Sequence, residues 1–223
     1  MRVISRMVFL ACLLSAQVFA QDPEPAENVN LTAHAIVSDA SERVMLVVEG
    51  AQEYVDEDPE RYYQAVHEVL DPVIDYRGFA RSVMGVYASK ERYQSLDGEG
   101  RKELREQLER FIVVMREGLI RTYGKGLLAF SGSRIAVSEP SADEAQASRV
   151  SVKQLIYSDE AQPYVLMYQM GRGKTGEWKL RNVIIETVNL GEIYKNQFQA
   201  AARKHDGDLN AVIDKWAAID VES

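Results

Sequence analysis

The sequence is almost free of cysteine, with Cys12 as the only one in 223 residues. Cys12 lies in an N-terminal segment that begins with the basic residues Arg2 and Arg6, continues through an apolar stretch and reaches the small residue Ala20. This order is typical of a cleavable secretory signal peptide, so we expect residues 1–20 to be removed after Ala20. The residues before Cys12 match a lipoprotein signal poorly. The mature chain then has no thiol, which excludes disulfides and leaves its stability to a hydrophobic core.

Long apolar runs and an excess of positive charge are also missing. No stretch after residue 20 is apolar enough over a sufficient length to span a bilayer. The chain has 26 Lys and Arg against 34 Asp and Glu, a formal net charge of −8, which becomes −10 when Arg2 and Arg6 leave with the signal. Such a charge disfavours nucleic acid and anionic lipid surfaces as partners. We therefore expect a secreted, soluble protein, which must dock on proteins rather than coat a membrane if it handles lipid.

Catalytic and metal-binding motifs are absent as well. The string from Gly171 to Gly176 contains Gly-Lys-Thr, but Tyr168 stands where a phosphate-binding loop needs glycine, and a strand pattern follows it. We interpret it as a hairpin turn. His34, His67 and His205 are isolated from one another and from any metal-ligand motif. The sequence therefore predicts no catalytic residue, no metal site and no cofactor, and we expect a protein that is not an enzyme.

Apolar residues at helical spacing fill the first part of the mature chain. They predict a first helix over about 31–54 and a long helix over about 101–130. Between these, a helix from Pro59 to Leu70 follows the N-cap Asp58, and a short helix that ends at Gly85 follows the N-cap Asp75. The longest of these has one apolar stripe: Leu104, Leu108, Phe111, Met115, Leu119, Tyr123 and Leu127. A final amphipathic helix is expected around Leu209 to Trp216, within a helical region of about 201–220.

Strand patterns replace the helical ones between about residues 133 and 187. Four strands joined by short turns predict an antiparallel meander: Arg134–Ser138, Ser148–Tyr157, Tyr164–Met170 and Trp178–Ile185. Both faces of the third strand are apolar, because Leu166 and Tyr168 alternate with Val165 and Met167. A small sheet needs a second cover for such a strand, either more helix or a hydrophobic ligand. We predict an α+β fold in one domain, residues 21–223, with a twisted antiparallel sheet of about four strands wrapped by several helices.

A strand led by Trp178 passes into a helix with Leu190, Ile193, Tyr194 and Phe198 on its apolar face. This stretch resembles the C-terminal signature of the MlaC family, also called toluene-tolerance auxiliary proteins. Two further segments, one beginning at Asp75-Tyr76 and one at residues 119–123, are similar to segments of the same family. The likeness extends from about Asp71 to Phe198. The chain departs from the family pattern at Arg181-Asn182, where an aromatic-Asp pair is usual.

The resemblance implies a periplasmic phospholipid carrier that buries acyl chains in a hydrophobic cavity between sheet and helices. Such a carrier moves phospholipid between the outer and inner membranes, in the retrograde direction, and maintains the lipid asymmetry of the outer membrane. The implied partners are phospholipid, an inner-membrane ABC transporter complex with a substrate-binding MCE-type subunit, and an outer-membrane lipoprotein-porin complex. Two alternatives stay open at this stage. One is a non-catalytic periplasmic adaptor with a filled core, and the other is a small hydrolase or isomerase on a cone-like α+β fold.

Thirteen apolar or aromatic residues are candidates for the wall of the expected cavity, and any of them can instead be ordinary core. They are Tyr76, Phe79, Met84, Phe111, Met115, Leu119, Tyr123, Leu127, Leu166, Tyr168, Ile184, Val188 and Tyr194.

Overall fold

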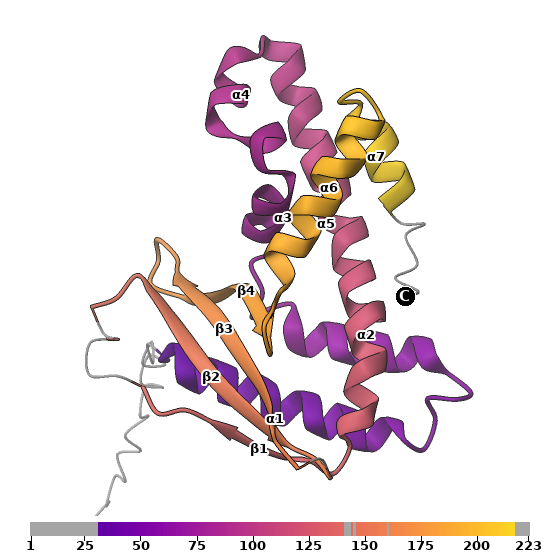
Figure 1. Cartoon of the computed structure of the whole chain (residues 1–223), viewed down its shortest axis with the longest axis vertical. Helices are drawn as coiled ribbons and strands as arrows, with labels where there is room; N and C mark the ends of the chain where they lie inside the picture. Colours follow the sequence, from indigo (N-terminus) through magenta and orange to yellow (C-terminus); the bar gives the residue numbers. More distant parts are fainter. Residues whose placement is uncertain (1–30, 141–143, 145, 160, 217–223) are drawn as a thin grey trace, which may run out of the picture.

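The computed structural model describes residues 31–140, 144, 146–159 and 161–216, so the predicted signal peptide and its cleavage after Ala20 lie outside the described residues. The described α-helices are α1 (Ala33–Ala51), α2 (Pro59–Leu70), α3 (Tyr76–Met84), α4 (Lys90–Ser95), α5 (Gly98–Leu127), α6 (Leu190–Lys204) and α7 (Leu209–Trp216). Short 3-10 helices follow α3 and α5, namely η1 (Gly85–Ala88) and η2 (Leu128–Phe130). The strands are β1 (Arg134–Val137), β2 (Arg149–Tyr157), β3 (Tyr164–Arg172), β4 (Trp178–Ile185) and β5 (Val188–Asn189). Figure 1 shows the sheet beside a helical bundle.

The predicted α+β class and the antiparallel meander are confirmed. The described strands form one sheet in the order β1-β2-β3-β4-β5, and every neighbouring pair is antiparallel. The expected hairpin between β3 and β4 is also present, because Gly173 N–H donates to the carbonyl of Glu177 over 2.7 Å and Gly176 has a φ of 95°. A left-handed φ of this kind favours glycine. The Gly-Lys-Thr string is therefore part of a hairpin turn.

The sheet has five strands where about four were expected. The fifth, β5, is only two residues long, and it pairs Val188 with Ile185 of β4. A tight turn precedes it, with Glu186 at a φ of 55°. The Asn189 side chain then accepts a hydrogen bond from the Glu192 backbone and caps α6. A run of β-branched residues does not reveal such a turn, so the sequence was wrongly interpreted as a strand that passes directly into the helix.

The start of α3 is joined to β4 at a bulge. Arg181 is the extra residue of the bulge, because Leu180 pairs with Met170 and Asn182 pairs with Gln169. Asp75, the N-cap of α3, donates its backbone N–H to the Leu180 carbonyl over 2.9 Å. Its carboxylate accepts a hydrogen bond from Gly78 N–H and forms an ion pair with Arg181. The predicted cap is confirmed, and it also fixes the helix to the sheet.

Helix α1 lies across one face of the sheet, and α5 runs from the helical bundle to the sheet, so that its second half stands beside the sheet (Figure 1). We call the sheet face toward α1 the inner face; it carries Leu166 and Tyr168, whereas Val165 and Met167 lie half-buried on the outer face. Helix α2 packs between α1 and the second half of α5, and α3, α6 and α7 pack around the first half of α5. Helix α4, which connects η1 to α5, was missed because its six residues bury no side chain.

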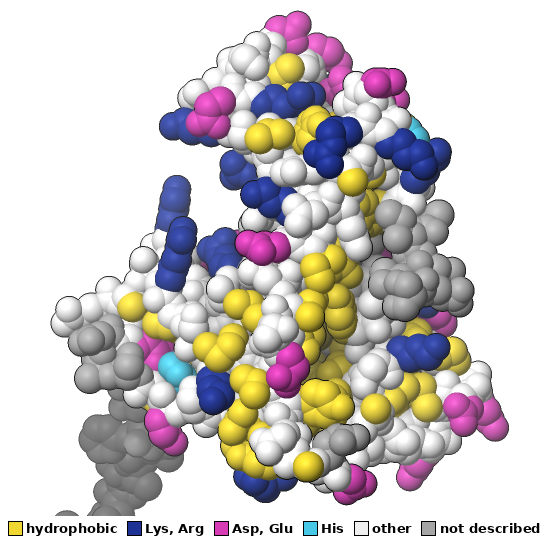
Figure 2. Space-filling view, in the orientation of Figure 1, with side chains coloured by type: hydrophobic (Ala, Val, Ile, Leu, Met, Phe, Trp, Pro, Cys, Tyr) yellow, Lys and Arg dark blue, Asp and Glu magenta, His cyan; other side chains and the backbone are white. Residues whose placement is uncertain are grey.

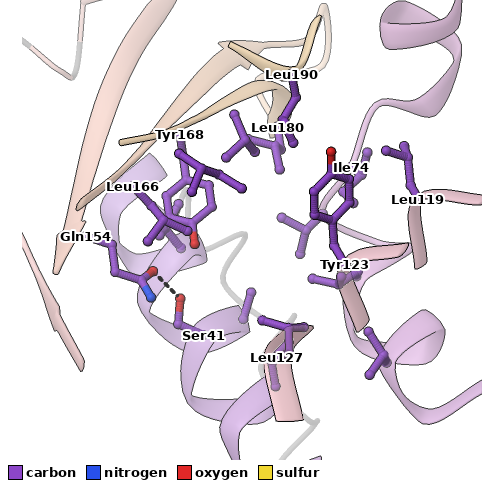
Figure 3. Close-up of a pocket in the computed structure, with 18 of the residues that line it drawn as sticks. Ser41, Ile74, Leu119, Tyr123, Leu127, Gln154, Leu166, Tyr168, Leu180 and Leu190 are labelled. Carbon is purple, nitrogen blue, oxygen red and sulfur yellow. Dashed lines mark hydrogen bonds between the residues drawn. The ribbon is translucent and has the colours of Figure 1, made fainter. Parts of the chain in front are cut away.

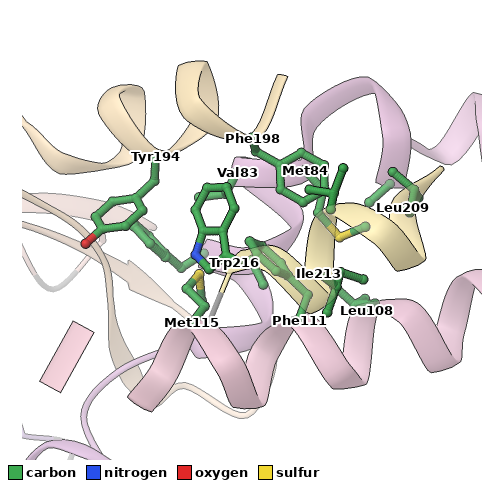
Figure 4. Packing of buried hydrophobic residues seen from close by; sticks show 14 of the residues in the cluster. Val83, Met84, Leu108, Phe111, Met115, Tyr194, Phe198, Leu209, Ile213 and Trp216 are labelled. Carbon is green, nitrogen blue, oxygen red and sulfur yellow. The ribbon is translucent and has the colours of Figure 1, made fainter. Parts of the chain in front are cut away.

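Buried side chains form three clusters instead of one. The largest, the bundle cluster, joins α3, α5, α6 and α7, and Figure 4 shows Phe111, Phe198 and Trp216 in contact at its centre. The ring centroid of Phe111 lies 4.9 Å from that of Phe198 and 5.2 Å from that of Trp216. A second cluster packs the end of α1 on α2 and Ile120. The third packs the start of α1 on the sheet, through Val37. Partly buried side chains flank each cluster, among them Tyr123, Leu127 and Tyr168.

The tight junction at α3 gives a test of this architecture. A Cβ at Gly78 would lie 2.2 Å from the Asp75 Oδ2 atom and 2.7 Å from Arg181 Nη1. Although alanine favours helices by about 1 kcal/mol over glycine, Gly78→Ala should lower the free energy of unfolding by about 1–2 kcal/mol, because it displaces the cap. Gly118→Ala in α5 is the control. A Cβ there meets nothing within 4 Å, so this change should raise stability by about 0.5–1 kcal/mol. Urea titration measures both, and equal effects would contradict the junction.

Candidate functional site

A cavity of about 350 Å³ lies between the inner face of the sheet, α1 and the second half of α5. Ligand pockets in proteins have volumes of roughly 300–1,000 Å³, whereas ordinary interiors are packed with few voids larger than a water molecule. Figure 3 shows that side chains from opposite walls point into this space, with Leu166 and Tyr168 on one side and Leu119 and Tyr123 on the other. In an ordinary protein interior, side chains would fill a space of this size, so the cavity is a candidate ligand site.

The sheet wall is made by the alternation of strand residues. Leu166 and Tyr168 of β3 pair with Ile185 and Val183 of β4, and all four side chains line the cavity. Side chains two apart on a strand point to the same face, which explains why this wall is continuous. At the bulge the alternation shifts by one residue, so Leu180 also lines the cavity.

The helix wall is the second half of α5. Its predicted apolar stripe continues through Leu119, Tyr123 and Leu127, which face the cavity. The first half of the same stripe, including Phe111 and Met115, lies in the bundle cluster. A helix of 30 residues is about 45 Å long, so one stripe can serve two environments. The back of the cavity is α1.

The cavity reaches solvent near the start of β3. Tyr164 lines it there and is 37% exposed, and its ring packs edge-on against Phe130 of η2 at a centroid distance of 5.1 Å. Figure 2 shows hydrophobic side chains gathered on the face between the sheet and α5. A long apolar ligand can enter here without passing through the packed clusters.

The cavity holds almost no charge. Burial raises the pKa of the hydroxyls of Tyr76 and Tyr168, so both side chains are neutral at physiological pH. Among the described residues that line the cavity, only Arg181 has a permanent charge, and it is paired with Asp75. His34, which pairs with the buried Glu144 at 2.6 Å, lies outside the cavity lining. Within the described ranges, no group of three His, Cys, Asp or Glu side chains is arranged to hold a metal ion.

Seven of the thirteen predicted wall residues line the cavity. They are Tyr76, Phe79, Leu119, Tyr123, Leu127, Leu166 and Tyr168. Four others, Met84, Phe111, Met115 and Tyr194, are buried in the bundle cluster. Ile184 lies on the outer face, opposite Met167, and Val188 of β5 is 44% exposed. Phe111 and Met115 do not line the cavity because the α5 stripe divides after Met115, and Ile184 falls on the other side of the strand alternation. Met84 of α3 and Tyr194 of α6 face the bundle instead.

Several lining residues were not among the predicted ones. The clearest are Val37, Ala40 and Ser41 of α1 and Gln154 of β2. The alternation of β2, with Val152 and Ile156 on the inner face, could have identified Gln154. Nothing in the sequence of α1 tells which of its apolar residues face the sheet and which face α2.

The fold and the cavity together define an α+β protein with a largely apolar cavity between a sheet and a helical layer. The MlaC protein family model matches residues 38–218, and the chain belongs to the MlaC family. It is 29% identical to the toluene tolerance protein ttg2D of Pseudomonas putida over 186 residues, which are 83% of this chain and 80% of that protein. The chain also has the fold of the phospholipid-binding protein of Ralstonia solanacearum, which was solved in complex with a phospholipid. The TM-score is 0.69 at 22% identity, covering 84% of this chain and 98% of that one.

The division of α5 into core and wall predicts different costs for the same substitution. Leu108 is buried in the bundle cluster, so Leu108→Ala should lower the free energy of unfolding by about 2–5 kcal/mol. Leu119 faces the cavity and is only half-buried, so Leu119→Ala should cost about 1 kcal/mol or less in ligand-free protein. Urea unfolding of the two delipidated variants measures the difference. A loss of 2 kcal/mol or more at Leu119 would show that this half of α5 is packed core.

Proposed function

We propose that the protein is a phospholipid carrier that holds acyl chains in the cavity. The observation that carries this proposal is a largely apolar cavity bordered by all three clusters of buried side chains. Membership of the MlaC family supports it, as does the fold shared with a protein that binds phospholipid.

The energetics favour an occupied cavity. Without a ligand, water enters the open cavity and contacts its apolar walls, which is unfavourable. A buried acyl chain removes this cost. Each methylene that the cavity buries also opposes release into water, by about 0.8 kcal/mol. The carrier therefore keeps its lipid while it diffuses.

Transfer to a membrane is a different process from release into water. A bilayer buries the same methylenes as the cavity, so exchange between the two is nearly neutral when water is excluded from the path. The protein then needs a docked, dry passage and no energy source of its own. No described helix has both the length and the hydropathy to cross a membrane.

The remaining parts of the proposal concern place and partners. We place the mature protein in the periplasm, where it accepts phospholipid from an outer-membrane lipoprotein-porin complex. It delivers the lipid to the MCE-type subunit of an inner-membrane ABC transporter complex, in the retrograde direction that maintains outer-membrane lipid asymmetry. The acidic charge of −10 expected for the mature chain supports docking on proteins over adsorption to anionic headgroups.

The two alternative functions lack support from the site. An adaptor would fill its interior, whereas this chain leaves a cavity open to solvent near Tyr164. A hydrolase would need a general base beside its nucleophile. The lining residues include Ser41, but no His, Asp or Glu is among them, and the Ser41 hydroxyl donates to the Gln154 carbonyl oxygen. We therefore propose that the protein has no catalytic activity.

The proposal predicts that the protein carries phospholipid when it is purified from the periplasm of the cells that produce it. Organic extraction followed by mass spectrometry would detect this lipid. Leu166→Glu places a carboxylate on the cavity wall, where it can be hydrated once the lipid is gone. The variant should fold and lose its lipid.

Met167→Glu is the matched control, because Met167 is the next residue of β3 and points to the outer face beside Lys153. It should keep a full complement of lipid. Retention of lipid by Leu166→Glu would remove this wall from the site, and unfolding of Leu166→Glu, seen by circular dichroism, would show that the position is packed core.

A further inference from the structure

One polar residue interrupts the apolar inner face of the sheet. Along β2, Val150, Val152 and Ile156 present apolar side chains to this face, and Gln154 takes the position between the last two. Gln154 is 2% exposed and lines the cavity. Burying a carboxamide among apolar groups is costly unless its hydrogen bonds are made, so its presence needs a reason.

The hydrogen bonds of Gln154 are only partly used. The Ser41 hydroxyl donates to its Oε1 atom over 2.7 Å, and Figure 3 shows this bond at the edge of the cavity. Among the described residues, no group accepts a hydrogen bond from the Gln154 amide nitrogen. An amide nitrogen has two N–H groups to donate. The cavity is the direction from which an acceptor can reach them.

A second polar group lies next to this amide. The Tyr168 side chain comes from β3, diagonally across from Gln154, and Figure 3 shows its hydroxyl directed toward Ser41 and Gln154. Three polar side chains from α1, β2 and β3 thus meet at one place in a largely apolar cavity. A role in fixing α1 to the sheet explains the Ser41 bond, but it leaves the amide N–H groups without a use.

We infer that Gln154 and Tyr168 form a hydrogen-bonding site for an oxygen atom of the bound lipid. This inference rests on the proposed function. The chemistry is that of an acceptor oxygen within the buried part of the ligand, supplied either by the ester carbonyl that joins a chain to glycerol or by an oxygen on the chain itself. Such a bond sets how deep the lipid lies and adds selectivity to a cavity that otherwise recognises only apolar volume.

The test compares lipids that differ only in these oxygens. Three phosphatidylethanolamines of equal chain length would compete for delipidated protein, with native mass spectrometry as the readout: a diester, its diether analogue, and a diester with a hydroxyl on one chain. The wild-type protein should bind either the diester about fivefold more tightly than the diether, or the hydroxylated diester about fivefold more tightly than the plain diester. A fivefold difference is expected for one net hydrogen bond. Preference for the diester over the diether assigns the ester carbonyl, and preference for the hydroxylated chain assigns the chain oxygen.

The variants show whether Gln154 and Tyr168 cause the preference. Ser41→Ala combined with Gln154→Leu removes the amide without leaving the serine unpaired, and Tyr168→Phe removes one hydroxyl with little risk to folding. Both should bind lipid and lose most of the preference, whereas Ser38→Ala, on α1 outside the cavity lining, should retain it. A wild type without preference, or variants that keep it, would overturn the site while leaving the carrier function in place. Failure of the wild type to bind any of the three lipids would overturn the carrier function itself.

Discussion

The structure depends on one mismatch, namely that the apolar inner face of the sheet is larger than the helical surface packed on it. The first half of helix α1 covers part of this face through Ala33 and Val37, whereas its second half packs against α2. Helix α5 stands opposite the rest of the face without closing on it. Apolar surface left in contact with water is unfavourable, so an apolar guest in the cavity would stabilise this geometry further.

The mismatch persists because other contacts hold the walls apart. The bundle cluster around Phe111 fixes the first half of α5, and the Tyr62 hydroxyl, which donates to the Gly124 carbonyl over 2.7 Å, ties the second half to α2. Asp75 and Arg181 join α3 to the bulge of β4. Collapse of the cavity would require giving up these contacts, and packed interiors resist such shifts.

Much of the fold could be predicted from the sequence, because caps and periodicity are local signals. Asp75 and Gly85 mark the ends of α3, and the β3-β4 hairpin follows from its glycines. The cavity wall was predicted less well, since a core residue and a wall residue have the same chemistry. Phe111 and Tyr123 belong to one stripe, and only the tertiary packing of α6 and α7 against its first half separates them. Gln154 was missed because a lone polar residue in a strand gains meaning only when the face it points to is known.

The most direct test of the account is a crystal structure of the protein purified with its natural ligand. The account predicts continuous electron density for acyl chains between Leu119 and Leu127 on one side and Leu166 and Tyr168 on the other. The polar headgroup should lie toward Tyr164 and solvent. A cavity filled by rearranged side chains, or lipid bound only on the outer face of the sheet, would contradict the central claim that this chain keeps its interior open for lipid.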